Sequence, residues 1–318
     1  MLNKVPNQSH PSSADSVLAS KGKSFHWARR LLEKQQAERA TRLYRLCRYI
    51  DDLGDEESSV EISKQKLLDV KNAIELGHAD NEVLIDGLNL LNECHIDKAI
   101  ILDLLTGVSS DTQLVRIEDQ AQLMRYCYQV AGTVGLMMTK VLDTHDAAAY
   151  PFAIDLGIAM QITNICRDIK ADALVNRRYI PANLVNDLEP IALINPNDQQ
   201  KDLVVAAVAK LLASAEKYYQ SGEKGLSYLP LQARLSILVA ARVYREIGRQ
   251  LLRQNCEYWP HRITVSMPRK MLITLQSLLS AMFTLSFWRH PKRHDAALHR
   301  DLINTVDSEL SPFKSYAS

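Results

Sequence analysis

The sequence predicts an all-α protein. Only 11 glycines and 11 prolines interrupt 318 residues, which favours long helices over short strands joined by tight turns. No run of alternating β-branched residues bounded by turn dipeptides is present, and no fixed-period repeat indicates a solenoid. Six stretches instead carry apolar residues at spacings of three and four, as a helix packed on a core does: residues 67–77, 99–108, 122–142, 152–169, 203–222 and 233–254.

Composition and punctuation indicate one helical domain between two tails. Residues 1–18 are polar with Pro and Ser and are predicted to form a flexible tail. No Pro-, Gly- or Ser-rich linker divides residues 19–290, and residues 291–318 are predicted to be a polar C-terminal tail. The net charge of +1 gives no general attraction for nucleic acid. Five scattered cysteines without a CxxC pair indicate reduced thiols, as in a cytoplasmic protein.

Two acidic stretches share one helical geometry. In "YRLCRYIDDLGDE", the residues Tyr44, Arg48, Asp51 and Asp55 are three or four apart and therefore lie on one helix face. In "QITNICRDIKAD", Gln161, Asn164, Asp168 and Asp172 repeat this spacing beside three isoleucines. A polar stripe on an otherwise apolar helix requires partners.

Oxygen ligands in this pattern favour a hard cation such as Mg²⁺, with Mn²⁺ as the alternative. No His or Cys lies on either stripe, which argues against zinc, and the EF-hand loop spacing fails after Asp51. Nearby arginines are available for phosphate oxygens: Arg48, Arg167, Arg177 and Arg178. The alternative is that each stripe is a solvated face with ordinary ion pairs.

Several motifs, in order, resemble the squalene/phytoene synthases. They are "SKGKSF", "CRYIDDLGD", "YCYQVAGTVG", "LGIAMQITNICRDIKAD" and "RRYIP", and the resemblance extends from about Ser20 to Lys270. The segments "YLPLQARLSILVAARVYREIG" and "YWPHRITVSMPRK" look most like the bacterial phytoene synthase branch.

This resemblance implies an isoprenoid-synthase fold with a central cavity, and head-to-head condensation of two prenyl diphosphates. Geranylgeranyl diphosphate is the expected substrate, and no NADPH is expected. By position, Asp51 and Asp55 match the metal-binding residues of the first motif, and Asn164, Asp168 and Asp172 those of the second. The positions that match the substrate and diphosphate site are Arg48, Tyr126, Gln161 and Tyr244.

The residues themselves extend this set. Tyr126, Tyr128 and Tyr244 are candidates for aromatic faces beside carbocations. Tyr44 shares the first acidic face. Gly132 and Gly135 weaken a helix, so close approach of substrate or of a neighbouring helix is expected there.

Two departures and three alternatives qualify the resemblance. Lys170 and Ala171 stand where the second motif usually has Gly and Glu; Lys170 lies off the stripe and is expected to point away. Asn176 and Arg178 replace the more usual Gly and apolar residue. The alternatives are a dehydrosqualene or squalene synthase that uses farnesyl diphosphate, a non-catalytic assembly factor, and a terpene cyclase.

Residues Met271–Trp288 carry no charge and are flanked by basic residues. Their length is at the lower limit for a membrane span, but six Ser, Thr and Gln side chains favour a buried or surface-docking helix. We expect a cytoplasmic protein that contacts the inner membrane peripherally through this segment.

Overall fold

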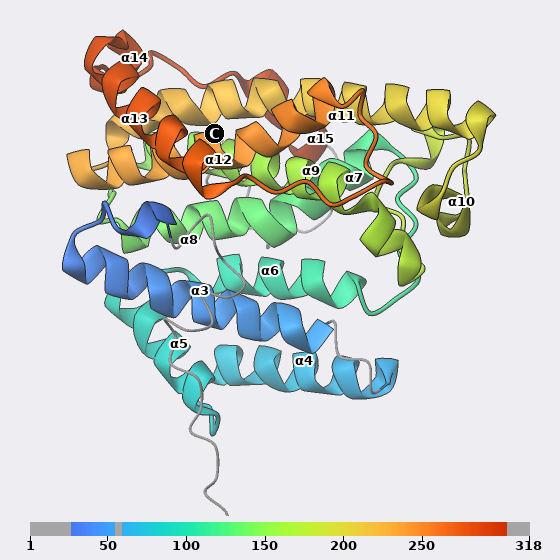
Figure 1. Ribbon diagram of the computed structural model, residues 1–318. Helices are drawn as coiled ribbons and strands as arrows, with labels where there is room; N and C mark the ends of the chain where they lie inside the picture. Colours follow the sequence, from blue (N-terminus) through green and yellow to red (C-terminus); the bar gives the residue numbers. More distant parts are fainter. Residues whose placement is uncertain (1–26, 55–58, 304–318) are drawn as a thin grey trace, which may run out of the picture.

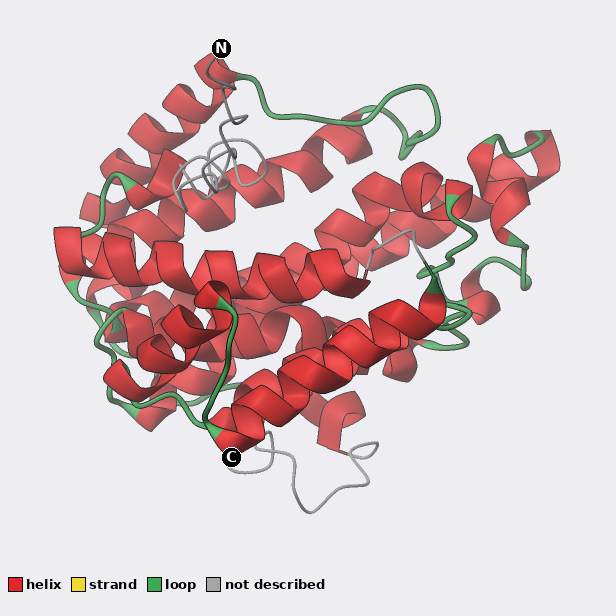
Figure 2. Ribbon diagram, turned by 90° about the horizontal axis from the view of Figure 1, so that it is seen from below, coloured by secondary structure: helices red, strands yellow, loops and turns green. Residues whose placement is uncertain are grey.

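The computed structural model describes residues 27–54 and 59–303. Within these ranges the fold is helical without a strand (Figure 2), and Arg116 and Arg178 form an isolated β-bridge. The predicted N-terminal tail, residues 1–18, and Asp55 lie outside the described residues. The helices are α3 (Lys34–Gly54), α4 (Val60–Leu76), α5 (Glu82–Glu93), α6 (Lys98–Ser110), α7 (Gln120–Cys127), the π-helix η1 (Tyr128–Gly132), α8 (Thr133–Val141), α9 (Tyr150–Leu174), α10 (Pro190–Ile194), α11 (Asp198–Gly225), α12 (Leu231–Arg253), α13 (Met267–Phe283), α14 (Leu285–Trp288) and α15 (Arg300–Ile303).

The predicted all-α class is confirmed, and α9 is the helix around which the others assemble. It contacts α8, η1, α11 and α12. Figure 1 shows α3–α6 on one side and α11–α13 on the other, with α8 and α9 between them. Fifteen residues of α9 are buried, including Ile162, Ile165 and Ile169. One face of this helix carries the polar residues Gln161, Asn164 and Asp168, which are not among its fully buried ones.

Glycines allow α8 and α9 to pack closely. A Cβ on Gly135 would lie 2.2 Å from the carbonyl oxygen of Ala153, and one on Gly157 would lie 2.3 Å from that of Ala131. Both distances are far inside van der Waals contact. At Gly135 the structure shows the expected close approach of a neighbouring helix, and Gly135 also lines the central cavity.

Helix α13 packs on α12, and α14 contacts α11 and the short helix Leu226–Tyr228. Ile273, Ser277 and Ala281 recur every four residues on the buried face of α13, and Phe287 of α14 is also buried. None of the helices in the described part of the chain is both long and apolar enough to cross a bilayer.

The segment that follows α14 lies against the domain as far as residue 303. The Tyr218 hydroxyl donates to the Leu298 carbonyl over 2.7 Å, and Leu302 is buried where α15 contacts α7. Residues 291–303 belong to the predicted polar C-terminal tail, and residues 304–318 lie outside the described ranges.

Candidate active site

A cavity of about 290 Å³ runs between α3, α8, α9, α11 and α12. Its wall is mostly apolar and combines alanines and glycines with larger residues such as Met138 and Phe152. Tyr44, Gln161, Asn164 and Tyr244 provide its polar end, and all four are residues that the sequence predicted for the site. Ala149, Phe152, Leu226 and Leu229 form the other end. The cavity therefore has the form of an apolar tunnel with a polar mouth.

Asn164 contributes a buried polar atom that lacks a hydrogen-bond partner among the described residues. Its Oδ1 atom is buried and accepts no hydrogen bond from the described residues, while its Nδ2 lies 3.5 Å from Gln161 Oε1. A buried carbonyl oxygen without a donor costs free energy unless a ligand satisfies it. Asn164 lines the cavity, so this oxygen is available to a cation or a ligand donor there.

The first acidic stripe continues from the mouth along α3. Arg48, one turn beyond Tyr44, donates from Nη1 to Asp51 over 2.8 Å and from Nη2 to Asp52. Its Nε is buried and has no partner within the described residues. Burial lowers the pKa of Arg48, and hydrogen bonding to Asp52 and the charge of Asp51 raise it more, so the guanidinium stays charged.

The second acidic stripe continues from Asn164 along α9. Asp168 accepts from Arg167 Nε over 2.9 Å and from Arg262 Nε and Nη2 over 2.7 and 3.0 Å. Burial raises the pKa of Asp168, but these two guanidinium groups lower it more, so the carboxyl stays ionised. Asp172 lies one turn further and raises the pKa of Arg262 through its charge.

Two tyrosines connect the charged groups of α3 with those of α9. Burial raises the pKa of Tyr44, the Arg48 charge lowers it, and Tyr244 and Asp51 raise it. Burial also raises the pKa of Tyr244. The charges of Arg167 and Arg262 lower this pKa, and the charge of Asp168 raises it. Tyr44 of the first stripe and Gln161 and Asn164 of the second line one cavity together with Tyr244.

Arg262 is a site residue that sequence reasoning missed. It lies in the loop between α12 and α13, 94 residues after Asp168, and its side chain is largely exposed. The segment "YWPHR" that contains it was part of the resemblance, but no helical spacing connects it to either stripe.

Of the predicted residues that do not line the cavity, Tyr126, Tyr128 and Arg177 bond to neither acidic stripe in the contacts that follow. Tyr126 donates to Asp111 Oδ2 over 2.9 Å and stacks on Tyr179, whose hydroxyl donates to Asp111 Oδ1 over 2.6 Å. Arg177 donates to the Asp111 carbonyl over 3.1 Å. The hydroxyl of Tyr128 in η1 bonds to Asp103 over 3.0 Å. Burial raises the pKa of Tyr126 well above its ordinary value, so this phenol is neutral.

The sequence departures have local structural reasons. Lys170 donates to the Trp259 carbonyl over 2.7 Å, in the loop that also carries Arg262, which agrees with its expected place off the stripe. Asn176 has φ of 59°, a left-handed conformation that Gly and Asn adopt readily. Arg178 is buried and donates to Asp187 and to the Leu188 carbonyl.

Comparison with known proteins agrees with this geometry. Residues 18–269 match the family described as squalene/phytoene synthase. The chain belongs to this family. It is 32% identical to a 15-cis-phytoene synthase of Enterobacter agglomerans over 85% of this chain and 95% of the relative. It is 30% identical to a 15-cis-phytoene synthase of Pantoea ananas over 90% of this chain and 96% of the relative.

A solved dehydrosqualene synthase has the same fold. It superimposes with a TM-score of 0.73 at 26% identity, covering 85% of this chain and 96% of that chain. The predicted isoprenoid-synthase fold is therefore confirmed, and the protein is a prenyltransferase.

Proposed function

We propose that this enzyme condenses two geranylgeranyl diphosphates head to head to form 15-cis-phytoene, as a step of carotenoid biosynthesis. The observation that carries the proposal is the apolar cavity whose polar mouth lies between two carboxylate-bearing helices. The names of its relatives in Enterobacter agglomerans and Pantoea ananas support the same product.

The donor set at the mouth fits Mg²⁺. It consists of carboxylates and an amide oxygen, and Asn164 Oδ1 lacks a donor among the described residues. We assign Asp51 of the first stripe and Asn164, Asp168 and Asp172 of the second as residues that would hold it, together with Asp55, which lies outside the described residues. When bound, Mg²⁺ neutralises the charge of the diphosphate and so makes it a better leaving group.

The arginines of the mouth act on the same group. Arg48 donates a hydrogen bond to Asp51 of the first stripe, and Arg262 donates one to Asp168 of the second. The buried Nε of Arg48 can in addition donate to a phosphate oxygen. When the allylic C–O bond breaks, these fixed positive charges stabilise the departing diphosphate.

The cavity wall then controls the carbocation. The apolar wall excludes water, and the neutral phenol rings of Tyr44 and Tyr244 lie at the end where the positive charge forms. The second substrate's double bond attacks this cation, and loss of a proton closes the three-membered ring of a cyclopropylcarbinyl diphosphate. That intermediate releases its diphosphate and rearranges, and loss of a second proton ends the reaction without NADPH.

The length of the cavity favours a twenty-carbon substrate. Its lining runs along α9 from Asn164 to Ala149, the residue before the helix; the part beyond Gln161 spans twelve residues, or about 18 Å at 1.5 Å per residue. An extended geranylgeranyl chain measures about 19 Å and a farnesyl chain about 14 Å, at about 1.3 Å per bond. The alternative is a dehydrosqualene synthase that uses farnesyl diphosphate. The observation that supports it is the likeness to a solved dehydrosqualene synthase.

The product and the carboxylate roles can be tested together. Purified protein with Mg²⁺ and either geranylgeranyl or farnesyl diphosphate, with and without NADPH, should give phytoene from the longer substrate alone. Asp51→Ala and Asp168→Ala should each lower turnover by at least about 100-fold, because a metal ligand is lost, while the helical circular dichroism spectrum is kept. Full activity in either variant would refute the metal assignment.

We also propose that α13 and α14 dock on an anionic membrane surface. Their outward side chains are apolar and exposed, namely Met271, Leu272, Leu275, Leu279, Met282, Phe283, Leu285 and Trp288. Exposed Arg289, Lys292 and Arg293 follow directly. Apolar contact together with basic charge is the pattern of interfacial membrane binding.

Two further observations support a lipid as the occupant. Leu226 and Leu229, at the apolar end of the cavity, pack in one cluster with Ala281 and Phe287 beneath the docking helices. A pocket of about 170 Å³ between α12 and α13 is lined by Arg242, Arg245, Arg249, Arg269 and Ser277 and by the carboxylate of Glu246, to which Arg269 donates over 2.9 Å. The buried Ser277 hydroxyl has no partner among the described residues, so the pocket can receive a phosphate headgroup.

Vesicle sedimentation tests the docking surface. The protein should bind phosphatidylglycerol vesicles and bind pure phosphatidylcholine vesicles weakly. The pair Leu275→Ser and Leu279→Ser should weaken binding at least about tenfold, because each leucine loses apolar burial. Leu76→Ser, at an exposed position on α4, is the matched control. Equal binding by both variants would refute this surface, and concentration-dependent dimerisation abolished by the pair would assign it to a second copy instead.

A further inference from the structure

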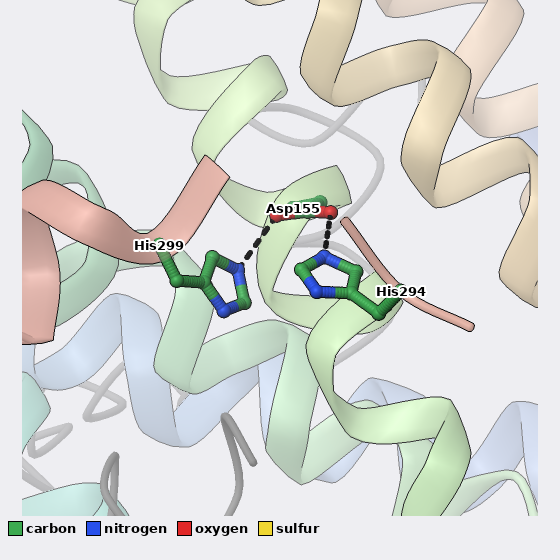
Figure 3. A group of neighbouring side chains, drawn as sticks. All are labelled: Asp155, His294 and His299. Carbon is green, nitrogen blue, oxygen red and sulfur yellow. Dashed lines mark hydrogen bonds and ion pairs between the residues drawn. The ribbon is translucent and has the colours of Figure 1, made fainter. Parts of the chain in front are cut away.

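Three buried side chains outside the cavity form a cluster with the donor set of a metal site. Asp155 lies on α9, and His294 and His299 lie in the segment after α14 (Figure 3). The two rings converge on one carboxylate: His294 Nε2 lies 2.7 Å from Oδ2, and His299 Nε2 lies 2.8 Å from Oδ1. Asp155 and His299 are fully buried, and the His294 side chain is 9% exposed.

The charge of Asp155 needs a partner. Asp155 is fully buried, and each of its carboxylate oxygens lies within hydrogen-bond distance of one imidazole Nε2. An ionised carboxylate away from water is stable only if it is hydrogen-bonded and its charge is compensated. The imidazoles supply the hydrogen bonds, and either an added proton or a cation bound between the three groups can supply the charge.

The spacing suits a small cation. One ligand atom from each residue can be chosen so that all three lie within 4.8 Å of one another. A tetrahedral zinc ion with ligands about 2.0–2.1 Å away places those ligands about 3.3 Å apart. The contacts of 2.7 and 2.8 Å, which involve different oxygens of Asp155, need to open by about half an ångström, and ligand atoms as far as 4.8 Å apart need to close toward about 3.3 Å.

We propose that Asp155, His294 and His299 bind one Zn²⁺ ion through a carboxylate oxygen and the two Nε2 atoms, with water as the fourth ligand. Two imidazoles and one carboxylate form a donor set that zinc accepts in proteins, and Mg²⁺ prefers oxygen. The ion takes the place of the Nε2 hydrogens that the carboxylate accepts in the metal-free form. A neutral ring then moves its proton from Nε2 to Nδ1, and a charged ring keeps its Nδ1 proton and releases the Nε2 proton to solvent.

The bound ion attaches the last described segment to the central helix. Residues 289–303 contribute few buried side chains, mainly His299 and Leu302. The ring of His294 packs edge-on against Phe152, which lines the apolar end of the cavity, with centroids 5.1 Å apart. The zinc site therefore supports one wall of the cavity without contacting it, and its existence does not depend on the substrate proposed above.

Metal content and ligand type test the proposal directly. The full chain, freed of metal and kept in excess Mg²⁺ to occupy the acidic stripes, should bind one equivalent of Zn²⁺. Co²⁺ in its place should give the intense visible bands of a tetrahedral site with nitrogen ligands, whereas oxygen-only octahedral binding gives weak ones. Zinc should also raise the midpoint of thermal unfolding, because it binds the folded state.

Variants assign the binding to these residues. Outer-shell partners alone are worth about 10- to 100-fold in zinc affinity, so Asp155→Asn and His294→Gln should weaken binding by more than about 100-fold. His290→Gln is the matched control in the same segment, where His290 stacks on Tyr228 with centroids 4.4 Å apart. It should bind zinc normally, as should Asp168→Ala.

No stoichiometric zinc in the wild-type protein, or an octahedral oxygen-type Co²⁺ spectrum, would overturn the proposal. So would unchanged zinc binding by folded Asp155→Asn or His294→Gln protein. If these variants do not fold, the wild-type Co²⁺ spectrum still decides the question. Because every readout is independent of turnover, the test stands even if the proposed substrate is wrong.

Discussion

Substituting Ala149 with phenylalanine should convert the enzyme from a twenty-carbon to a fifteen-carbon substrate. Ala149 is buried at the apolar end of the cavity, about 18 Å along the helix from Gln161. A benzyl group extends about 4 Å further than a methyl group. The remaining length, about 14 Å, matches an extended farnesyl chain and is about 5 Å too short for a geranylgeranyl chain.

The expected loss can be estimated from the cost of overfilling an apolar site. Forcing extra methylenes into filled space costs about 1–3 kcal/mol, so kcat/KM for geranylgeranyl diphosphate should fall about 10- to 100-fold. The kcat/KM for farnesyl diphosphate should stay constant or rise. Both are measured by quantifying hydrocarbon products with each substrate alone and then in competition.

Ala148→Phe is the matched control, because Ala148 precedes Ala149 but is exposed. It should leave both kcat/KM values unchanged. If Ala149→Phe keeps full activity with geranylgeranyl diphosphate, the prenyl chain does not occupy this end of the cavity, and the length argument for phytoene fails.

Three further changes test the site and its scaffold. Arg262→Gln should lower kcat/KM about 10- to 100-fold because a charge-assisted contact is worth about 1.5–3 kcal/mol; steady-state kinetics with unchanged rates would contradict this role. Gly135→Ala should lower the free energy of unfolding in urea, because the new Cβ would lie 2.2 Å from a carbonyl oxygen of α9; equal or higher stability would contradict the close packing. Burial raises the pKa of Glu246, but hydrogen bonds from Arg269 and Arg253 lower it more. Its contribution to stability is therefore present above the unfolded pKa and is lost as pH falls through the folded one. Glu246→Gln should lower stability at pH 7 by about 1–3 kcal/mol and make acid unfolding less steep, and an unchanged pH dependence would refute this assignment.

The sequence by itself determined the helical class and which residues share a helix face. This is possible because the period of 3.6 residues is a local property of the backbone. It placed Tyr44 with Arg48 and Asp51, and Gln161 with Asn164 and Asp168, before any tertiary contact was known. It also placed Lys170 off the acidic stripe, in agreement with its hydrogen bond to Trp259.

Only the tertiary structure decided which of these helix faces meet, and which predicted site residues lie away from the cavity. Tyr126, Tyr128 and Arg177 bond to Asp111 or Asp103 rather than line the cavity, a choice that helical spacing does not fix. Arg262 reaches Asp168 across 94 residues, and Asp155 meets His294 across 139. Contacts at such separations depend on how whole helices pack, because neither partner's neighbours in sequence carry a signal of the other.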